Sequence, residues 1–343
     1  MKFKLLILFL FLLSATACKN KPVKPLPDYM TITNNYVNLR GLALGTSYSI
    51  TYKDVEKRDF HDSVQNLLDR FEASLSIYRD SSIIAKVNAN EDVILDDYFI
   101  TVFNKASEIS EATGGAFDIS ASPLFEIWGW GAKERQEVSP QMIDSLKQYV
   151  GMDKVRIEDR RIVKTNPNIT LNVNAIAKGY SSDVIATFLK NMGIDDYLVE
   201  IGGEIVAKGK NPQEMAWRTG IDMPVEGNLI PGQALQVVLS VTDAGMATSG
   251  NYRRFYVENG QTYYHTIDPR TGYQAKQNIL SATVIAPDCL TADAYATAFM
   301  VLGLENSKQI LAQHPEIEAY FIYSENGENK EFFSDKTKTR IVE

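Results

Sequence analysis

The sequence predicts an α+β fold in which helices pack against mixed sheets. The first observation is that apolar residues recur at helical spacing over residues 59–76, 97–112 and 175–192. The second is that strand-like runs stand before, between and after these helices without a regular βαβ order. The third is the amount of chain beyond the N-terminal region, about 310 residues, which is enough for one large domain or two closely joined lobes. We expect a single domain over residues 36–343.

Residues 1–17 have the features of a bacterial lipoprotein signal peptide. Lys2 and Lys4 form a short basic region, and residues 5–13 form an apolar run that is too short to span a bilayer. Small residues follow and lead into Ala15-Thr16-Ala17-Cys18, which matches a lipobox. We expect cleavage before Cys18, lipidation of Cys18 and a place in the cell envelope on the periplasmic side. An ordinary cleaved signal with an incidental cysteine is the alternative.

Residues 18–35 are polar and contain three prolines, which predicts a disordered tether between the lipid and the domain. Apart from Cys18 the only cysteine is Cys289, so an intramolecular disulfide is excluded, and we expect its thiol to be a small buried group. The formal net charge of −8 argues against nucleic acid or anionic lipid as the main partner.

The first half of the domain is expected to contain the helices that surround a small-residue loop. Gly114-Gly115 ends the second helix. Trp128 and Trp130 alternate with glycines, a pattern that suits a ring-lined pocket wall, although core packing explains them equally well. The expected elements are, in order, two strand pieces in 37–52 around Gly45-Thr46, helices over 59–76 and 97–112, a loop over 114–124 that contains Asp118, and a short helix over 140–149.

The second half is expected to be richer in strands. Gly193 ends the helix over 175–192, and Gly202-Gly203 separates two strand pieces as a bulge or close approach. The expected elements are, in order, a strand pair in 156–172, the helix over 175–192, strands in 196–208, 217–223, 236–242 and 279–286, a helix that begins at Thr291, a helix over 305–313 and a strand over 318–323.

Three short segments within residues 242–297 suit phosphate and metal chemistry. Thr248-Ser249-Gly250 is too rich in small residues for a plain strand, so we expect a turn that presents hydroxyls and backbone N–H groups to an anion. His265, one of three histidines, precedes an Asp-Pro-Arg-Thr-Gly turn. Thr291 is the expected N-cap of a helix that places Asp293 and Thr297 on one face. A carboxylate and a hydroxyl are hard oxygen ligands suited to Mg²⁺.

Each of these segments also has an ordinary structural explanation, and their spacing alone does not name a reaction. No GxGxxG, Walker, HExxH or GxSxG motif occurs, so the corresponding enzyme classes are poorly supported. Eight blocks, in order, resemble the ApbE family of bacterial flavin-transferase lipoproteins. The blocks are Leu44-Gly45-Thr46, Ser76-Ile77-Tyr78, and residues 113–118, 176–180, 199–204, 247–252, 265–272 and 292–297.

The resemblance implies a T-fold-like architecture with a flavin cleft. It assigns Mg²⁺ to the side chains of Asp293 and Thr297 and to the backbone carbonyl of Ser181. The hydroxyls and N–H groups of Thr248, Ser249 and Gly250 would add phosphate donors. The residues that it places around FAD are Leu44, Tyr78, Ala116, Phe117, Asp118, Lys178, His265 and Ile267. The chain departs from the family pattern at Leu44, Asn172, Asn174, Ala175 and Ser181, where the family usually has Met, Asp, Gly, Gly and Ala.

The resemblance also implies the reaction. FMN would pass from FAD to a threonine hydroxyl of another exported protein, commonly a subunit of a membrane redox complex, with release of AMP. His265 is the expected general base, because an imidazole titrates near the working pH. Two alternatives stay open at this point: a pyrophosphatase that splits FAD into FMN and AMP, and a flavin-binding lipoprotein without turnover.

Overall fold

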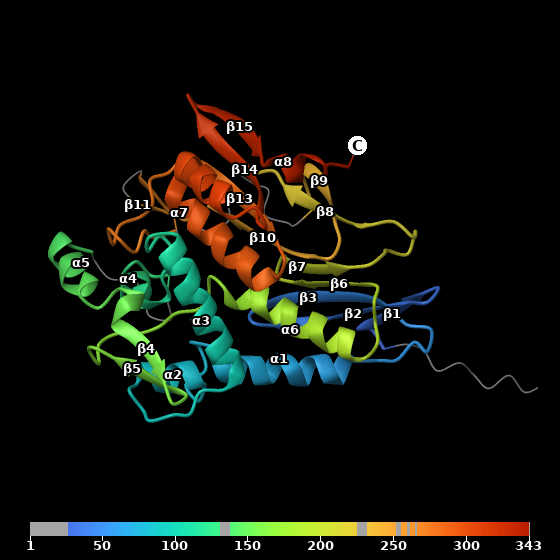
Figure 1. Ribbon diagram of the computed structural model, residues 1–343, viewed down its shortest axis with the longest axis horizontal. Helices are drawn as coiled ribbons and strands as arrows, with labels where there is room; N and C mark the ends of the chain where they lie inside the picture. Colours follow the sequence, from blue (N-terminus) through green and yellow to red (C-terminus); the bar gives the residue numbers. More distant parts are fainter. Residues whose placement is uncertain are drawn as a thin grey trace, which may run out of the picture.

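The computed structural model describes residues 27–130, 138–224, 232–251, 255–258, 261–264 and 266–342. Its centre is a nine-stranded sheet in the order β1-β2-β3-β6-β7-β10-β13-β14-β15 (Figure 1). These strands are β1 (Met30–Thr33), β2 (Tyr36–Ala43), β3 (Thr46–Lys53), β6 (Tyr197–Ile201), β7 (Glu204–Lys208), β10 (Ala244–Gly250), β13 (Ile279–Ala286), β14 (Glu318–Glu325) and β15 (Glu328–Phe333).

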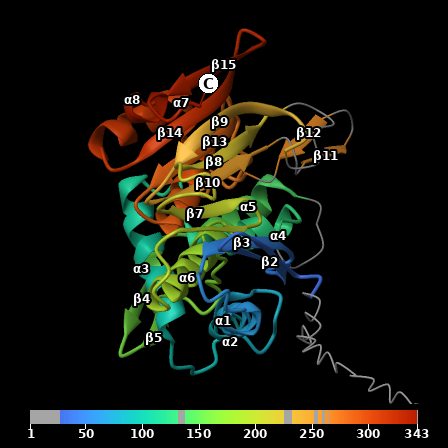
Figure 2. The same ribbon diagram turned by 90° about the vertical axis from the view of Figure 1, so that its right-hand side faces the viewer.

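Three two-stranded ribbons and the helices complete the fold. The ribbons are β4–β5 (Val155–Glu158 and Arg161–Lys164), β8–β9 (Trp217–Asp222 and Leu235–Val241) and β11–β12 (Phe255–Glu258 and Gln261–Tyr264). The helices are α1 (His61–Leu75), α2 (Ile83–Asn88), α3 (Asp97–Ala112), α4 (Ser122–Ile127), α5 (Pro140–Lys147), α6 (Ala177–Asn191), α7 (Cys289–Gln313) and α8 (Asp335–Lys338), with 3₁₀ turns at Ile119–Ala121 and Met152–Lys154. Figure 2 shows α1 and α2 at one end of the molecule and β14, β15 and α8 at the other.

The α+β class is confirmed, but the expectation of mixed strand pairing is wrong for the described strands. Every pairing between neighbours in the central sheet is antiparallel. Short hairpins join β1 to β2, β2 to β3, β6 to β7 and β14 to β15, and such links require antiparallel neighbours. Among the described residues, no helix has the length and apolar character needed to cross a membrane.

Alternating residues of the central strands serve two separate cores. In β10, Ala247 lies in the largest core cluster with residues of α3 and α7, while Met246 packs with the β8–β9 ribbon. Val284 and Ile285 of β13 divide in the same way. A strand covered on both faces needs apolar residues at successive positions, which is why residues 279–286 are almost wholly apolar. The helices therefore cover one face of the sheet and the β8–β9 ribbon covers the other.

A bend in α7 explains how a long helix connects two antiparallel neighbours. Gly303 interrupts the helix with φ 74° and ψ 173°. In the sheet Ile285 of β13 lies opposite Glu318 of β14, so both ends of α7 must return to the same end of these strands. A straight helix of 25 residues would be about 37 Å long, which its short links cannot bridge at about 3.5 Å per residue. The glycine, which tolerates positive φ, therefore allows the antiparallel order.

Two predicted boundaries are corrected. The segment expected to be a disordered tether to residue 35 contains β1, which pairs with β2 through a turn with Asn34 at φ 57°. Met30 of this strand is buried in the core, which gives the segment a reason to be ordered. The N-cap of α7 is Asp288, whose carboxylate accepts from the N–H of Thr291, so Thr291 is the third residue of the helix. The signal peptide and Cys18 lie outside the described residues.

Candidate active site

Helices α6 and α7 meet near their N-terminal ends, where Gly179 of α6 faces the first residues of α7. A Cβ atom on Gly179 would lie 2.3 Å from the carbonyl oxygen of Cys289 and 2.7 Å from Cβ of Asp293. A Cβ atom on Gly245 of β10 would lie 2.2 Å from the backbone nitrogen of Cys289. Both glycines therefore let the backbones of α6, α7 and β10 converge at one point. Cys289 itself is buried and its thiol is free, as expected.

Asp293 projects into this junction with almost no exposure to solvent. Its side chain is buried, and its Oδ2 accepts a hydrogen bond of 2.9 Å from the N–H of Gly179. Burial raises the pKa of Asp293, while the charge of Lys178 and the N–H of Gly179 act in the opposite direction. The carboxylate is thus held between a cation and a helix terminus.

The N–H of Gly179 belongs to the first turn of α6, which begins after Ile176, and no helical carbonyl is available to it there. Its bond to Asp293 therefore caps α6 with a side chain of α7. Ser181, the predicted backbone ligand, lies buried within α6, two residues after Gly179.

Thr297 lies one turn after Asp293 and faces the end of β10. Its Oγ1 is 3.2 Å from Oγ of Ser249, and the neighbouring Thr248 bonds Thr283 of β13 at 2.8 Å. The structure thus brings Asp293, Thr297 and Ser249 together, as the sequence predicted. The three side chains offer one carboxylate and two hydroxyl oxygens.

The expectation that residues 248–250 form a turn is wrong. Residues 244–250 form strand β10, which pairs with β13 from Gly245 to Gly250. The small residues serve close packing against α7, as the contact between Gly245 and Cys289 shows, rather than turn formation. Ser249 consequently offers its hydroxyl to the site, whereas Thr248 points to the opposite face of the sheet, where it bonds Thr283.

Lys178 stands beside Asp293 and forms an ion pair with Glu204 at the start of β7. The Glu204 side chain is buried, and its second oxygen, Oε2, has no hydrogen-bond partner among the described residues. Burial opposes the charged form of Lys178, but the carboxylates of Glu204 and Asp293 outweigh this effect and raise the pKa. Lys178 therefore contributes a positive charge to the site.

The turn between β2 and β3 also reaches this cluster. A Cβ atom on Gly202 would lie 2.8 Å from Cγ2 of Thr46 and 3.3 Å from Cδ of Lys178, and the N–H of Gly202 donates to Ser47. Leu44 adopts φ 51° in this turn, and its N–H donates to Oε1 of Glu72 at 2.6 Å. The structure thus places Leu44 near Lys178, although they are far apart in the sequence.

The other predicted flavin contacts divide into exposed and buried groups. Tyr78 is 65% exposed, and its hydroxyl accepts from the amide of Asn174, just before α6. Ala116 and Phe117 are buried in the main core, so their side chains are not free to line a cleft. Asp118 is also buried; it accepts from the N–H and hydroxyl of Ser120, and burial raises its pKa.

The segment after β12 is fixed against a small separate core. Ile267 is buried with α4 and α5, and the indole N–H of Trp128 donates to the carbonyl of Gly272 at 3.0 Å, so Trp128 is a packing residue. Asp268 and Arg270 form a two-bonded ion pair in the turn. His265, the predicted base, lies outside the described residues.

Two acidic residues of the junction were not assigned from the sequence: Asp183, whose carboxylate accepts from the N–H groups of Cys289 and Leu290, and Glu204. Both carried a usable signal, because each is an acidic residue next to an apolar run. No group of three or more His, Cys, Asp or Glu side chains suited to a metal occurs among the described residues. A metal at this junction would therefore depend on one carboxylate with hydroxyl and carbonyl oxygens, a set that suits Mg²⁺.

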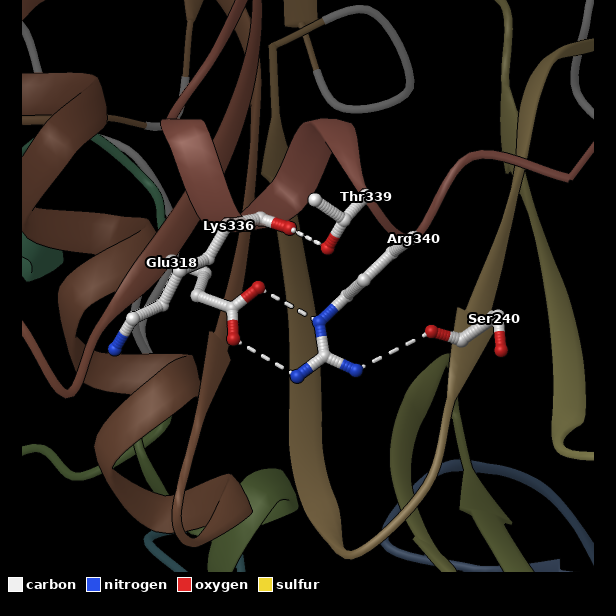
Figure 3. A pocket seen from close by; sticks show the side chains of 5 residues that line it. All are labelled: Ser240, Glu318, Lys336, Thr339 and Arg340. Carbon is white, nitrogen blue, oxygen red and sulfur yellow. Dashed lines mark hydrogen bonds and ion pairs between the residues drawn. The ribbon is translucent and has the colours of Figure 1, made fainter.

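A hollow of about 370 Å³ lies elsewhere, between Ser240 of β9, Glu318 of β14 and the C-terminal segment (Figure 3). Arg340 crosses it and bonds both oxygens of Glu318, at 2.6 and 2.8 Å, and it also donates to the carbonyl of Ser240. The guanidinium group is engaged by these partners. Its bonds attach the C-terminal segment to β9 and β14. None of the predicted site residues lines it.

The chain is similar to proteins of known family and activity. The chain matches the ApbE family over residues 44–321. It is 31% identical to the FAD:protein FMN transferase of Vibrio cholerae over 311 residues, which cover 88% of this chain and 92% of the relative. It is 30% identical to the enzyme of that name from Haemophilus influenzae over 306 residues, which cover 85% and 88%.

Solved structures give the same result. The flavin transferase ApbE from Vibrio cholerae superposes with a TM-score of 0.80 at 30% identity, covering 89% of this chain and 99% of that one. The flavinyl transferase ApbE of Pseudomonas stutzeri, in its apo form, superposes with a TM-score of 0.79 at 28% identity, covering 88% and 96%.

Proposed function

The chain belongs to the ApbE family, and on this premise we propose that it transfers FMN from FAD to a threonine hydroxyl of another exported protein and releases AMP. The observation that carries the proposal is the junction of α6, α7 and β10. It gathers a buried carboxylate, two hydroxyls and a lysine at one point. This is a set of groups that suits a pyrophosphate and a divalent cation.

The residues fit Mg²⁺, and we assign it to the carboxylate of Asp293, the hydroxyl of Thr297 and the carbonyl of Ser181. All three are hard oxygen ligands, and Asp293 is held in place by the N–H of Gly179. Mg²⁺, when bound, supplies positive charge that stabilises the leaving phosphate.

The transfer breaks one P–O bond of the FAD pyrophosphate and forms another. The threonine oxygen attacks the phosphorus of the FMN half, and the phosphate of AMP departs with the bonding electrons. His265 accepts the hydroxyl proton, because a neutral imidazole is a base near neutral pH. Lys178 contributes charge beside the phosphates, and Ser249 contributes a hydroxyl donor. Leu44 and Tyr78 offer apolar and aromatic surface to the flavin ring.

The proposal extends to location and partner. A lipobox that ends at Cys18 places the enzyme in the cell envelope, anchored by lipid and facing the periplasm. The acceptor is then an exported protein, and a subunit of a membrane redox complex fits the chemistry, because covalent flavin serves electron transfer. The acidic charge of the chain suits neither nucleic acid nor anionic lipid as a competing partner.

The test is incubation with FAD and Mg²⁺, with and without an acceptor protein identified by its gain of FMN mass on co-expression. Transfer predicts AMP only with acceptor present, and no modification when the acceptor threonine is changed to valine. AMP in the absence of acceptor would instead identify an FAD pyrophosphatase, and no AMP in either arm would leave only flavin binding. Asp293→Asn is the control, because it keeps the shape of the side chain and removes the charge that the metal requires.

A further inference from the structure

Asp183 joins the two helices that carry the proposed metal ligands. It lies on α6, one turn after Gly179, and its two carboxylate oxygens accept from two backbone N–H groups of α7. The N–H of Cys289 is 2.9 Å from Oδ1, and the N–H of Leu290 is 2.7 Å from Oδ2. These N–H groups belong to the first turn of α7, where no helical carbonyl is available to them.

A second carboxylate caps the same helix from its own side. Asp288 precedes α7, and its Oδ1 accepts from the N–H of Thr291 at 2.7 Å. The three N–H groups of residues 289–291 are therefore divided between two acids. Of these two acids, only Asp183 lies on another element. It is therefore the acid that fixes the start of α7 relative to α6.

The two helices are thus joined by two sets of bonds with opposite direction. At Asp183 the carboxylate of α6 accepts from the backbone of α7. At Gly179 the backbone of α6 donates to the carboxylate of Asp293 on α7. A displacement of α7 along α6 would disturb both sets together, because Asp293 is only one turn beyond Cys289. It would also move the Asp293 carboxylate relative to the first turn of α6.

We propose that Asp183 is a positioning residue of the metal site: it fixes α7 against α6 so that the Asp293 carboxylate keeps the place beside Gly179 in which it can bind a divalent cation. The inference rests on the proposed function as far as the presence of a metal is concerned. The positioning of Asp293 by Asp183 does not depend on that function. Asp183 touches neither the metal nor the substrate in this arrangement. It acts through the backbone of α7.

The test compares Asp183→Asn with Asp288→Asn as a matched control. Each change removes one negative charge at the N-terminus of α7. Asparagine at 288 still offers the single acceptor that Thr291 needs, whereas asparagine at 183 can serve only one of two N–H groups and turns its own NH₂ toward the other. Binding of Mn²⁺ alone, followed by electron paramagnetic resonance in the full-length protein without FAD, should weaken at least tenfold in Asp183→Asn and by less than about twofold in Asp288→Asn.

A second measurement separates this inference from the metal assignment. The amide proton of Gly179 bonds a carboxylate, so its NMR resonance should move upfield in Asp183→Asn and stay in place in Asp288→Asn. If the parent protein binds no Mn²⁺ but the Gly179 resonance moves, the metal assignment fails and the positioning of Asp293 stands. If the resonance does not move, or if the two variants bind Mn²⁺ equally, the proposal is overturned.

Should Asp183→Asn yield too little folded protein, Asp183→Glu replaces it. The longer side chain keeps both acceptor oxygens and so supports folding, but its added methylene group displaces α7. We expect weakened Mn²⁺ binding and a smaller movement of the Gly179 resonance. Parental values for both measurements in Asp183→Glu would overturn the proposal.

Discussion

The backbone N–H of Gly179 donates to Oδ2 of Asp293 across a sequence separation of 114 residues. This single bond ties the first turn of α6 to the second turn of α7. It is possible only because residue 179 has no side chain, since a Cβ atom there would overlap the backbone of Cys289. The geometry of the site is therefore sensitive to the smallest change at this position.

Gly179→Ala tests that sensitivity. Alanine within a helix is ordinarily more favourable than glycine by about 1 kcal/mol, so a site without crowding would become more stable. We expect the opposite sign here, a loss of roughly 1–3 kcal/mol, because the added methyl group separates α6 from α7. Urea denaturation measures the free energy of unfolding. An increase in stability would show that the close contact of the two helices is not rigid.

The ion pair between Lys178 and Glu204 can be separated into a structural and a functional part. Lys178→Met should destabilise the protein more, because it leaves the buried carboxylate of Glu204 without its partner and Asp293 without the neighbouring positive charge. Glu204→Gln should destabilise it less, because Lys178 is partly exposed and keeps Asp293 beside it. The double variant should recover the part of the stability that the unpaired Glu204 costs in Lys178→Met, but it should not recover FAD affinity. Denaturation and FAD titration of all three variants provide the comparison. Recovery of FAD binding in the double variant would limit Lys178 to a structural role.

His265→Asn tests the assignment of the general base. Loss of a positioned base lowers a rate by roughly 10²–10⁴-fold, and we expect a fall of this size in FMN transfer with little change in FAD affinity. In the parent, transfer should decrease on acidification between about pH 8 and 5, the range in which histidine side chains titrate, because a protonated imidazole no longer accepts a proton. Near-parental transfer by the variant would remove His265 from the reaction. A joint loss of rate and FAD affinity would mean that it shapes the cleft instead.

Lys164 provides a pH dependence that is independent of the active site. Burial lowers its pKa to about 8, and its ammonium group donates to the carbonyl of Val87 and to Oδ1 of Asn90. The unfolded chain then binds more protons than the folded protein between about pH 8 and 10.5, so Lys164 makes stability rise with pH across this interval. Lys164→Met should remove that rise. Replacing Lys190, which is exposed on α6, should leave it unchanged, and equal pH profiles for all three proteins would contradict the shift.

Cys18→Ser tests the anchor. The change should release the protein from the membrane fraction, because the lipid attaches to the cysteine sulfur, and it should leave the FMN transfer rate within about twofold of the parent. Fractionation and the transfer assay give the two readouts. A variant that stays in the membrane fraction would place the anchor elsewhere in the chain.

Much of the local structure could be predicted from the sequence, because hydrophobic periodicity reports which face of an element is buried. The helix over residues 97–112 has the predicted bounds, and α1 and α6 differ from prediction by one or two residues at each end. Prediction failed for residues 248–250, where small residues that indicated a turn form a strand. These residues are small because the strand packs closely against α7. The two segments are some forty residues apart, and composition does not encode a contact between them.

The sequence by itself determined the family, the α+β class and the pair formed by Asp293 and Thr297, because these depend on motif order and on helical spacing within a few residues. The tertiary structure alone decided which groups surround that pair. The choice of Glu204 as the partner of Lys178, the attachment of α7 to Asp183 and the capping of α6 by Asp293 all depend on bonds between residues distant in the chain. Spacing along the sequence carries no information on such bonds, since they form only when packing brings separate elements to hydrogen-bonding distance.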